Sequence, residues 1–351
     1  MAKILYGVCG IGIGHAIRSS EVITHLRKKH EVLVLSSGTA YPHLKKKLPN
    51  VHLVPGFEFA FKKNSIQNVR TILKNIAKLN AQTYHLFKNV TQKLDQFQAD
   101  LVISDMDTFS MYYAKDHQLP LITLDNQHYL FYGNYKAPDE YAVGSIKGKL
   151  ALKIATLPAD KYLVLSFPKT HLKPDTPAEL FNPILRKEIF TVKSITRDYI
   201  FVYQSMPTDK HLINLLKKIK ENFIVYGFNL EKKEGNITFK KFHEGKKYLQ
   251  ELANAKAIIS SAGFTLLSEA LYFQKPIFAL PIKKHFEQTL NALYLKQHQF
   301  GDYSEEPTAE HLLTFLKKIA QKKYKTLPKW NNHPLYIRLD TIIEEHTQRE
   351  K

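Results

Sequence analysis

Cysteine is almost absent from this sequence, and long apolar runs are absent altogether. Cys9 is the single cysteine among 351 residues, so no disulfide can form within the chain, which fits a reducing compartment. No stretch approaches the roughly 18 uncharged apolar residues of a membrane span. The N-terminal apolar run is broken by Gly7 and Gly10 and is too short for the core of an export signal. We therefore expect a cytoplasmic protein that can lie peripherally on a membrane without crossing it.

Acidic residues are scarce relative to basic ones. The 51 Lys and Arg residues stand against 32 Asp and Glu residues, which gives a formal net charge of +19. Such an excess favours an anionic partner, whether a lipid surface, a nucleotide, a nucleic acid or an acidic polymer. No nucleic-acid recognition motif is visible, so we do not expect a nucleic acid as the partner. The remaining composition, 44% hydrophobic and 24% charged, is ordinary for a globular protein and excludes a disordered or collagen-like chain.

Short apolar runs alternate with helical patterns in both halves of the chain. In the first half, the strand candidates are residues 4–9, 32–35, 51–54, 101–104, 121–124 and 162–165. In the second half, they are residues 199–203, 223–226, 237–239, 257–260 and 277–279, with helical patterns at 209–220, 246–254, 264–273, 286–298 and 308–323. Strands that alternate with helices predict parallel sheets with βαβ crossovers.

We therefore predict an α/β protein with two Rossmann-like domains facing a cleft, since a single core stops growing at roughly 250–300 residues. The expected N-terminal domain covers residues 1–167. An interdomain linker that contains four prolines and no clear period covers 168–197, and the C-terminal domain covers 198–327. The tail, 328–351, carries a helix that could pack back on the N-terminal domain.

A glycine-rich turn follows the first predicted strand and leads into a helix. A P-loop would need Lys-Ser/Thr after the glycines, and no such pair follows here. A dinucleotide-binding motif would need Gly-x-Gly-x-x-Gly and an acidic residue after the second strand, and this sequence has neither. His15 lies at the helix start, where the helix dipole disfavours an imidazolium and keeps a neutral imidazole ready as a base. Arg18 lies one turn later on the same face. The alternative is that His15 merely begins the helix and Arg18 is a solvated cation.

This turn and a downstream block resemble glycosyltransferases of the GT-B fold. The turn reads Gly-x-Gly-His-x-x-Arg from Gly12 to Arg18. The block at 260–270 is followed by Glu-Gln-x-x-Asn-Ala at 287–292, and residues 182–186 resemble the interdomain segment of the family. The nearest group contains the peptidoglycan lipid-linked N-acetylglucosaminyltransferase and the diacylglycerol glycosyltransferases. Residues 104–107 and 125–128 resemble its teichoic-acid-biosynthesis-like subgroup.

The resemblance implies that the C-terminal domain binds a nucleotide-sugar donor. Backbone N–H groups around Gly263 and Thr265, with the start of their helix, suit a diphosphate, and Ser261 belongs to the same loop. The family has paired glycines where this chain has Ala262 and Gly263. The loop after the first strand of this domain is often glycine-rich in the family, but here it reads Tyr-Gln-Ser-Met-Pro, with Ser205 as its candidate donor contact.

Four further side chains are implied in donor binding. Glu269 would accept the ribose hydroxyls, and its alternative is an exposed helical glutamate. Phe242 would neighbour the base, and core packing is its alternative. Gln288 and Asn291, three residues apart, would present their amides to the sugar from one helix face, against a capping or solvated role.

In the first domain, the resemblance makes His15 the general base for the acceptor hydroxyl. Asp105 and Asp107 follow a strand end and are candidates to orient it, although Asp105 could instead cap the next helix. Gly12, Gly14 and Arg18 would lie on the acceptor or phosphate side. The family implies inversion at the anomeric carbon. We expect neither a cofactor nor a metal, because the Asp-x-Asp at 105–107 belongs to a motif of another glycosyltransferase fold and no His/Cys cluster has zinc spacing.

Residues 59–94 form a basic segment with helical apolar spacing and no acidic residue. Its cations are Lys62, Lys63, Arg70, Lys74, Lys78, Lys88 and Lys93. Such a segment suits an anionic membrane surface, and its alternative is a packed helix with a solvated basic face.

The sequence therefore predicts an inverting, metal-independent glycosyltransferase. The favoured donor is a UDP-sugar, and the expected acceptor is a hydroxyl of a cell-envelope glycolipid or polysaccharide precursor. Two alternatives stay open at this point: a sugar-nucleotide 2-epimerase, which needs no acceptor, and a DNA-modifying glucosyltransferase.

Overall fold

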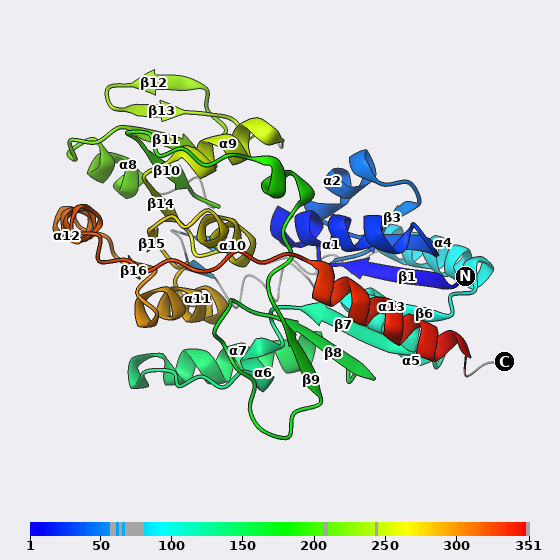
Figure 1. Cartoon of the computed structure of the whole chain (residues 1–351). Helices are drawn as coiled ribbons and strands as arrows, with labels where there is room; N and C mark the ends of the chain where they lie inside the picture. The colour runs from blue at the N-terminus through cyan, green and yellow to red at the C-terminus, as the bar shows by residue number, and fades with distance from the viewer. Residues whose placement is uncertain (57–60, 63–64, 67–80, 206–209, 243–244, 349–351) are drawn as a thin grey trace. The chain divides into compact units, whose positions relative to one another are not determined.

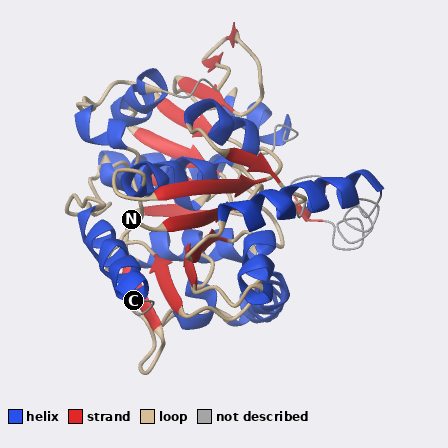
Figure 2. Cartoon of the chain, turned by 90° about the vertical axis from the view of Figure 1, so that its right-hand side faces the viewer, coloured by secondary structure: helices blue, strands red, loops and turns tan. Residues whose placement is uncertain are grey.

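A computed structural model describes residues 1–56, 61–62, 65–66, 81–205, 210–242 and 245–348. The chain divides into two compact units. Unit 1 comprises Met1–Ala60, Gln67–Leu185 and Asn331–Lys351, and unit 2 comprises Phe61–Ile66 and Arg186–Trp330. Figure 1 shows the course of the chain, and Figure 2 shows the strands of each unit flanked by helices.

Unit 1 is built on a seven-stranded parallel sheet in the order β3-β2-β1-β6-β7-β8-β9. The strands are β1 (Lys3–Val8), β2 (Glu31–Ser36), β3 (Val51–Leu53), β6 (Leu101–Asp105), β7 (Leu121–Asp125), β8 (Lys161–Leu165) and β9 (Ala178–Phe181). The helices are α1 (Ile13–Leu26), α2 (Ala40–Lys47), α4 (Ala81–Phe97), α5 (Thr108–Asp116), α6 (Tyr129–Tyr132), α7 (Ala142–Ala155) and α13 (His333–Gln348), with a 3-10 turn, η1 (Asp139–Tyr141). Its central strands are continuous apolar runs because helices cover both faces of a parallel sheet.

Unit 2 repeats the plan with a sheet in the order β12-β13-β11-β10-β14-β15-β16, in which only β12 runs antiparallel to its neighbour. The strands are β10 (Ile200–Tyr203), β11 (Phe223–Tyr226), β12 (Lys232–Glu234), β13 (Ile237–Phe239), β14 (Ala257–Ser260), β15 (Ile277–Ala279) and β16 (Gly301–Tyr303). The helices are α8 (Lys210–Leu216), α9 (Lys246–Asn254), α10 (Phe264–Tyr272), α11 (Phe286–Gln297) and α12 (Ala309–Ala320), with η2 (Lys187–Thr191). A short antiparallel pair, β4 (Phe61–Lys62) and β5 (Ser65–Ile66), completes the described strands.

The α/β fold class with two doubly wound sheets is confirmed, but the segment expected as a linker is divided between the two units and contains β9 and η2. Residues 168–185 belong to unit 1, and they include β9, which pairs with β8 at the sheet edge. Residues 186–197 belong to unit 2. Strand β9 has only four residues, and an alternation with a period of two cannot be recognised over so short a run. Prolines on both sides of it also favour a loop over a strand.

Helix α13 packs within unit 1. Its apolar residues Leu335, Leu339, Ile342 and Ile343 are buried. On α1, His25 stacks on Tyr336 with ring centroids 4.2 Å apart and bonds Asp340 at 2.8 Å. Just before the helix, the Asn332 side chain accepts from the Leu185 N–H and donates to the Leu185 carbonyl. The chain therefore leaves unit 1 at Leu185 and returns to it beside the same residue.

Much of the basic segment predicted at 59–94 lies outside the described residues, including Lys63, Arg70, Lys74 and Lys78. In α4, Lys88 and Lys93 are exposed, whereas Val90 is buried. No helix within the described ranges combines the length and the apolarity that crossing a bilayer requires.

Candidate functional site in unit 1

The candidate site lies at the carboxyl edge of the first sheet. Strands β1, β6 and β7 are neighbours, so the residues that follow Val8, Asp105 and Asp125 are brought to one edge. In open parallel sheets this edge is where ligands bind. Helix α1 begins there after Gly12, whose φ of 74° suits glycine, and His15 occupies its first turn.

Asp105 is the centre of the site. Its carboxylate is fully buried and lies 2.8 Å from His15 Nδ1 through Oδ1. Arg18 donates to both carboxylate oxygens, from Nε at 2.8 Å and from Nη2 at 2.5 Å. Ser19 Oγ donates to Oδ2 at 2.8 Å. The last residue of β6 is thus held by three side chains of α1.

The electrostatics keep Asp105 ionised. Burial alone would raise its pKa, but the charge of Arg18 and the hydrogen bonds from Arg18 and His15 outweigh burial and hold that pKa well below its usual range. A carboxylate only accepts hydrogen bonds, so the His15 tautomer that donates from Nδ1 satisfies it. That tautomer leaves the lone pair on Nε2. The His15 side chain is partly accessible, at 12% exposure, and its Nε2 lies 3.4 Å from Gln127 Nε2.

Arg18 is not a solvated cation. It is buried, and beyond Asp105 its guanidinium donates from Nη1 to Asn126 Oδ1 at 2.5 Å and from Nη2 to Gln127 Oε1 at 3.4 Å. Asn126 and Gln127 follow β7, so Arg18 joins α1 to the ends of β6 and β7. Its place on the acceptor or phosphate side, which the resemblance implies, stays a prediction.

Asp107 is directed elsewhere than Asp105. It is the N-cap of α5, and its carboxylate accepts from Ser110 N at 2.8 Å. Met106 between the two aspartates has a φ of 56°, a left-handed turn that separates their directions. Burial raises the pKa of Asp107 to about 6. The helix-capping role that we had considered for Asp105 therefore falls to Asp107, and Asp105 is the aspartate that contacts His15.

A second histidine–aspartate pair lies nearby and was not singled out from the sequence for a role. His128 Nδ1 lies 2.7 Å from Asp125 Oδ2, and the His128 backbone N–H donates to Asp125 Oδ1 at 2.8 Å. Both residues are buried, and the imidazole packs on Tyr132 and Tyr162. This pair fixes the turn from β7 into α6.

In unit 2, the loop after β14 has the expected form. Ala262, which stands where the family has glycine, has a φ of 51°, and Gly263 is the N-cap of α10. A Cβ built on Gly263 would meet no heavy atom within 4 Å. Ser261 Oγ accepts from Ser205 N at 3.2 Å and donates to Gln204 Oε1 at 3.0 Å, which joins the two loops expected to hold the donor. Thr265 follows in the first turn of α10.

Glu269 is not an exposed helical glutamate. It is buried, and its Oε1 accepts from Arg186 Nε at 2.6 Å. Arg186 is also buried, with its guanidinium 5.8 Å from the centre of the Tyr248 ring. In this structure the carboxylate expected to accept ribose hydroxyls is engaged by an arginine.

The other donor candidates also have partners within unit 2. Gln288 and Asn291 are buried rather than solvated. Gln288 Oε1 accepts from Ile282 N at 2.9 Å, and Asn291 Nδ2 donates to the Ala262 carbonyl at 3.0 Å, so Asn291 supports the loop before α10. Phe242 packs edge-on against Tyr248 with ring centroids 4.9 Å apart, as its core-packing alternative predicts.

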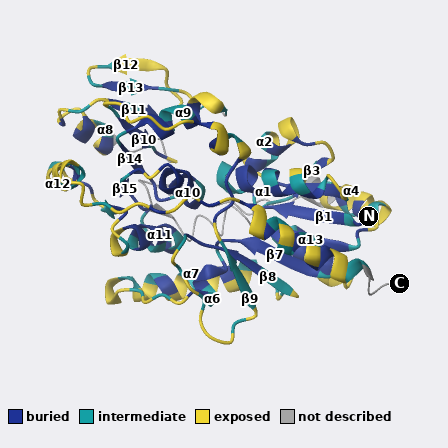
Figure 3. Cartoon of the chain, in the orientation of Figure 1, coloured by how far each residue is buried: buried dark blue, intermediate teal, exposed yellow. Residues whose placement is uncertain are grey.

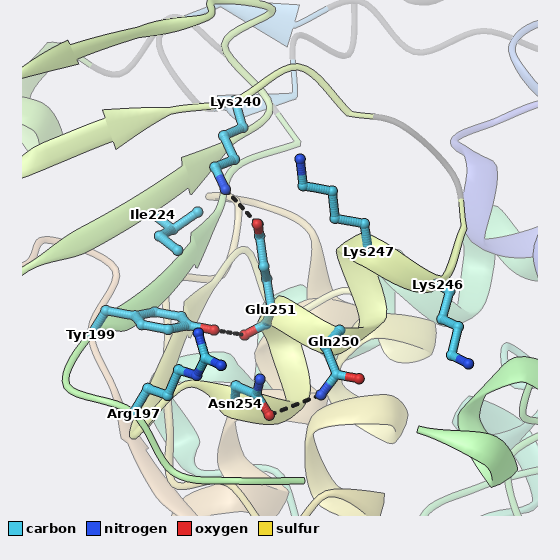
Figure 4. Close-up of a pocket in the computed structure, with 9 residues that line it drawn as sticks. All are labelled: Arg197, Tyr199, Ile224, Lys240, Lys246, Lys247, Gln250, Glu251 and Asn254. Carbon is cyan, nitrogen blue, oxygen red and sulfur yellow. Dashed lines mark hydrogen bonds and ion pairs between the residues drawn. The ribbon is translucent and has the colours of Figure 1, made fainter. Parts of the chain in front are cut away.

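A pocket of about 720 Å³ runs along α9 in unit 2 (Figure 4). Its central acid, Glu251, bonds Lys240 and accepts from Tyr226 OH, and its backbone carbonyl accepts from Tyr199 OH. Gln250 donates to Asn254 further along the helix. Arg197, Lys246 and Lys247 also line the pocket. In the described part of the chain, no group of three or more His, Cys, Asp or Glu side chains could hold a metal ion.

Comparison with known proteins identifies the family. The model of glycosyl transferase family 1 matches residues 2–320. An uncharacterized glycosyltransferase from Methanosarcina mazei is 22% identical over 363 residues, which cover 92% of this chain and 91% of that protein.

Two solved structures share the fold. One is UGT2 of Phytolacca americana, solved with UDP-2fluoro-glucose and pterostilbene, with a TM-score of 0.62, 16% identity and 92% coverage of both chains. The other is the calicheamicin glycosyltransferase CalG4, with a TM-score of 0.61, 14% identity, and coverage of 91% of this chain and 90% of that one. The expected two-domain GT-B fold is thus confirmed, and the chain belongs to glycosyl transferase family 1 and is a glycosyltransferase.

Proposed function

We propose that the enzyme transfers a sugar, with inversion, from a nucleotide-sugar donor to an acceptor hydroxyl, and that His15 is the general base. The observation that carries this proposal is the pairing of His15 with a buried, ionised Asp105 at the carboxyl edge of the first sheet. Asp105 and Arg18 are positioning residues, because they act on the substrate only through His15.

The reaction follows from the tautomer that Asp105 favours. His15 Nε2 takes the proton of the acceptor hydroxyl while the acceptor oxygen forms a bond to the anomeric carbon. The bond from that carbon to the donor diphosphate breaks, and the diphosphate leaves with the electron pair. Attack from the face opposite the leaving group inverts the anomeric configuration. The imidazolium formed on His15 is stabilised by the Asp105 carboxylate 2.8 Å away.

We place the donor on unit 2, at the start of α10. Backbone N–H groups at a helix N-terminus attract phosphate, and the open space beside Gly263 leaves room for a close approach. Ser261, Ser205 and Asn291 support this loop. A uridine diphosphate is the favoured nucleotide. The binding of a UDP-sugar analogue by the Phytolacca americana enzyme supports this choice.

We propose that the acceptor is a lipid-linked hydroxyl of an envelope glycolipid or polysaccharide precursor at the inner face of the membrane. The resemblance of the motifs to lipid-modifying glycosyltransferases and the net charge of +19 support it.

A donor screen followed by a transfer assay tests the chemistry. Thermal shift against UDP-, GDP-, CMP- and dTDP-sugars selects the donor, and incubation with that donor alone excludes a 2-epimerase if no epimer forms. His15→Ala should then lower turnover by about 10²–10⁴-fold, with donor binding nearly unchanged.

The matched control is His25→Ala, which removes a second histidine of α1 that also lies 2.8 Å from an aspartate, Asp340. It should leave turnover per folded molecule unchanged. Normal turnover by His15→Ala with the true acceptor would show that the base is another group. Loss of donor binding in that variant would show that the donor sits on unit 1.

A further inference from the structure

Helix α7 of unit 1 exposes an apolar stripe. Val143, Ile146, Leu150 and Ile154 are 61%, 66%, 57% and 73% exposed. Their spacing of three, four and four residues places them on one face of the helix. The opposite face is anchored by the buried Ser145 and Leu152. Figure 3 shows exposed positions along α7, which contrast with the buried strands of the sheet.

Such a stripe is unusual for a helix of a folded domain. A surface helix normally turns its apolar face inward and its polar face outward. Here the outward face carries four of the large apolar side chains that the described residues expose, and they follow one another along a single helix. A contiguous exposed apolar patch marks a surface that binds a partner or a membrane.

The lysines beside the apolar stripe favour an anionic partner. Helix α7 contains Lys147, Lys149 and Lys153 and no acidic residue. At 100° per residue, Lys147 lies on one side of the stripe and Lys153 on the other, and both are exposed. Lys149 is partly buried, with its ammonium 5.4 Å from the centre of the Tyr135 ring.

Two acidic residues lie directly before the helix. Asp139 and Glu140 of η1 are exposed, and they lie toward the N-terminal end of α7, where the helix dipole favours negative charge. Within α7 itself, the charged residues beside the stripe are all cations.

We propose that α7 is a docking helix for an anionic phospholipid surface. The stripe would enter the boundary between headgroups and acyl chains, and the flanking lysines would extend to the headgroup phosphates. Protein interfaces are depleted of lysine, whereas an apolar stripe edged by lysines is typical of helices that lie in a membrane surface. This inference deepens the lipid-linked acceptor of the proposed function and rests on it for its biological meaning.

Vesicle flotation with the full-length protein tests the proposal, without donor or acceptor. The probe is vesicles of phosphatidylcholine with or without an equal part of phosphatidylglycerol. Wild type should bind the anionic vesicles more tightly, and salt should weaken that binding. Ile146→Ser/Ile154→Ser should lower affinity by about 100-fold, since burying each such side chain contributes about 10-fold. Lys147→Glu/Lys153→Glu should lower it by at least about 25-fold, from about 5-fold for each lysine near the surface.

The matched control is Lys46→Glu/Lys115→Glu, which changes the net charge equally at exposed lysines of α2 and α5. It should bind nearly as wild type does. Three results would overturn the proposal: α7 variants that bind like wild type, binding that is lost only in Lys88→Glu/Lys93→Glu of α4, or a wild-type dimer that Ile146→Ser/Ile154→Ser converts to a monomer. The last would assign the stripe to a second copy of the chain. The His15 assay is independent of all three, because a soluble acceptor analogue reports transfer without vesicles.

Discussion

Asp105→Asn replaces one carboxylate oxygen by an NH₂ group. Asp105 is the side chain of the site that accepts the most hydrogen bonds. The carboxylate contacts His15 Nδ1, Arg18 Nε and Nη2, and Ser19 Oγ. A carboxamide offers one oxygen and one NH₂ group, so at least one of these donors would face another donor. The shape of the side chain is kept, and its charge is lost.

The structure sets the size of the effect. Arg18 is 3% exposed, so Asp105→Asn leaves a buried cation without its charged partner. Removing one partner of a buried ion pair costs about 3–5 kcal/mol. For a domain of this size, 1 kcal/mol shifts Tm by roughly 2–4 °C, so we expect unit 1 to melt roughly 6–20 °C lower. Turnover should also fall by about 10²–10⁴-fold, because His15 loses the acceptor that fixes its tautomer.

Calorimetry and the transfer assay, both run below the melting transition, separate the two effects. His15→Ala should lose turnover with little loss of Tm, because the imidazole lies at the edge of the cluster. Asp105→Asn should lose both, and Asp116→Asn, at an exposed position on α5, should lose neither. An Asp105→Asn protein that melts with the wild type and turns over normally would refute the argument that this carboxylate holds Arg18 and orients His15.

Two further predictions concern other buried carboxylates. The pKa of Asp107 is raised from 3.8 to about 6, so its contribution to stability is fully present below about pH 3.8 and is lost as pH rises through about 6. Asp107→Asn keeps the cap and should remove about 3 kcal/mol of pH dependence between pH 4 and 7, measured by urea unfolding; an unchanged slope would contradict the assignment. Glu269→Gln removes the charge that pairs with the buried Arg186 and should destabilise unit 2 by about 3–5 kcal/mol, whereas replacing both residues by methionine should restore much of the melting temperature. If Glu269→Gln melts like the wild type and only its affinity for the donor falls, then Glu269 binds the donor and does not stabilise the fold through Arg186.

The elements of the fold were largely predictable, because long buried strands and amphipathic helices leave periodic patterns. Helix α9 begins and ends at the predicted residues, 246 and 254. Strands β9, β12 and β16 were missed for a common reason: each has three or four residues and contains a charged one. Pairing with a neighbouring strand, rather than a local pattern, makes them strands.

The site was predictable in its residue types and not in its pairings. The spacing after β6 could not tell Asp105 from Asp107, because the left-handed turn at Met106 decides which carboxylate faces α1. Likewise, the helical position of Glu269 does not show Arg186, which approaches from 83 residues away in the chain. Contacts between residues that are far apart in the chain depend on how the whole fold packs. A single sequence therefore indicates a candidate site residue, but it does not indicate the residue that this side chain contacts.

The return of the chain to unit 1 has a consequence for synthesis on the ribosome. The sheet of unit 1 is complete once β9 has emerged, but α13, which covers part of α1 and bonds His25 through Asp340, follows only after all of 186–330 has been made. At about 5–20 residues per second, this delay is roughly 7–30 s. Throughout it, the surface that receives Leu339 and Ile342 stays uncovered while the second unit is being synthesised. Unit 1 is therefore the first domain to be synthesised and the last to be completed. A chaperone that binds nascent chains would have the longest time to bind at the surface that α13 later covers.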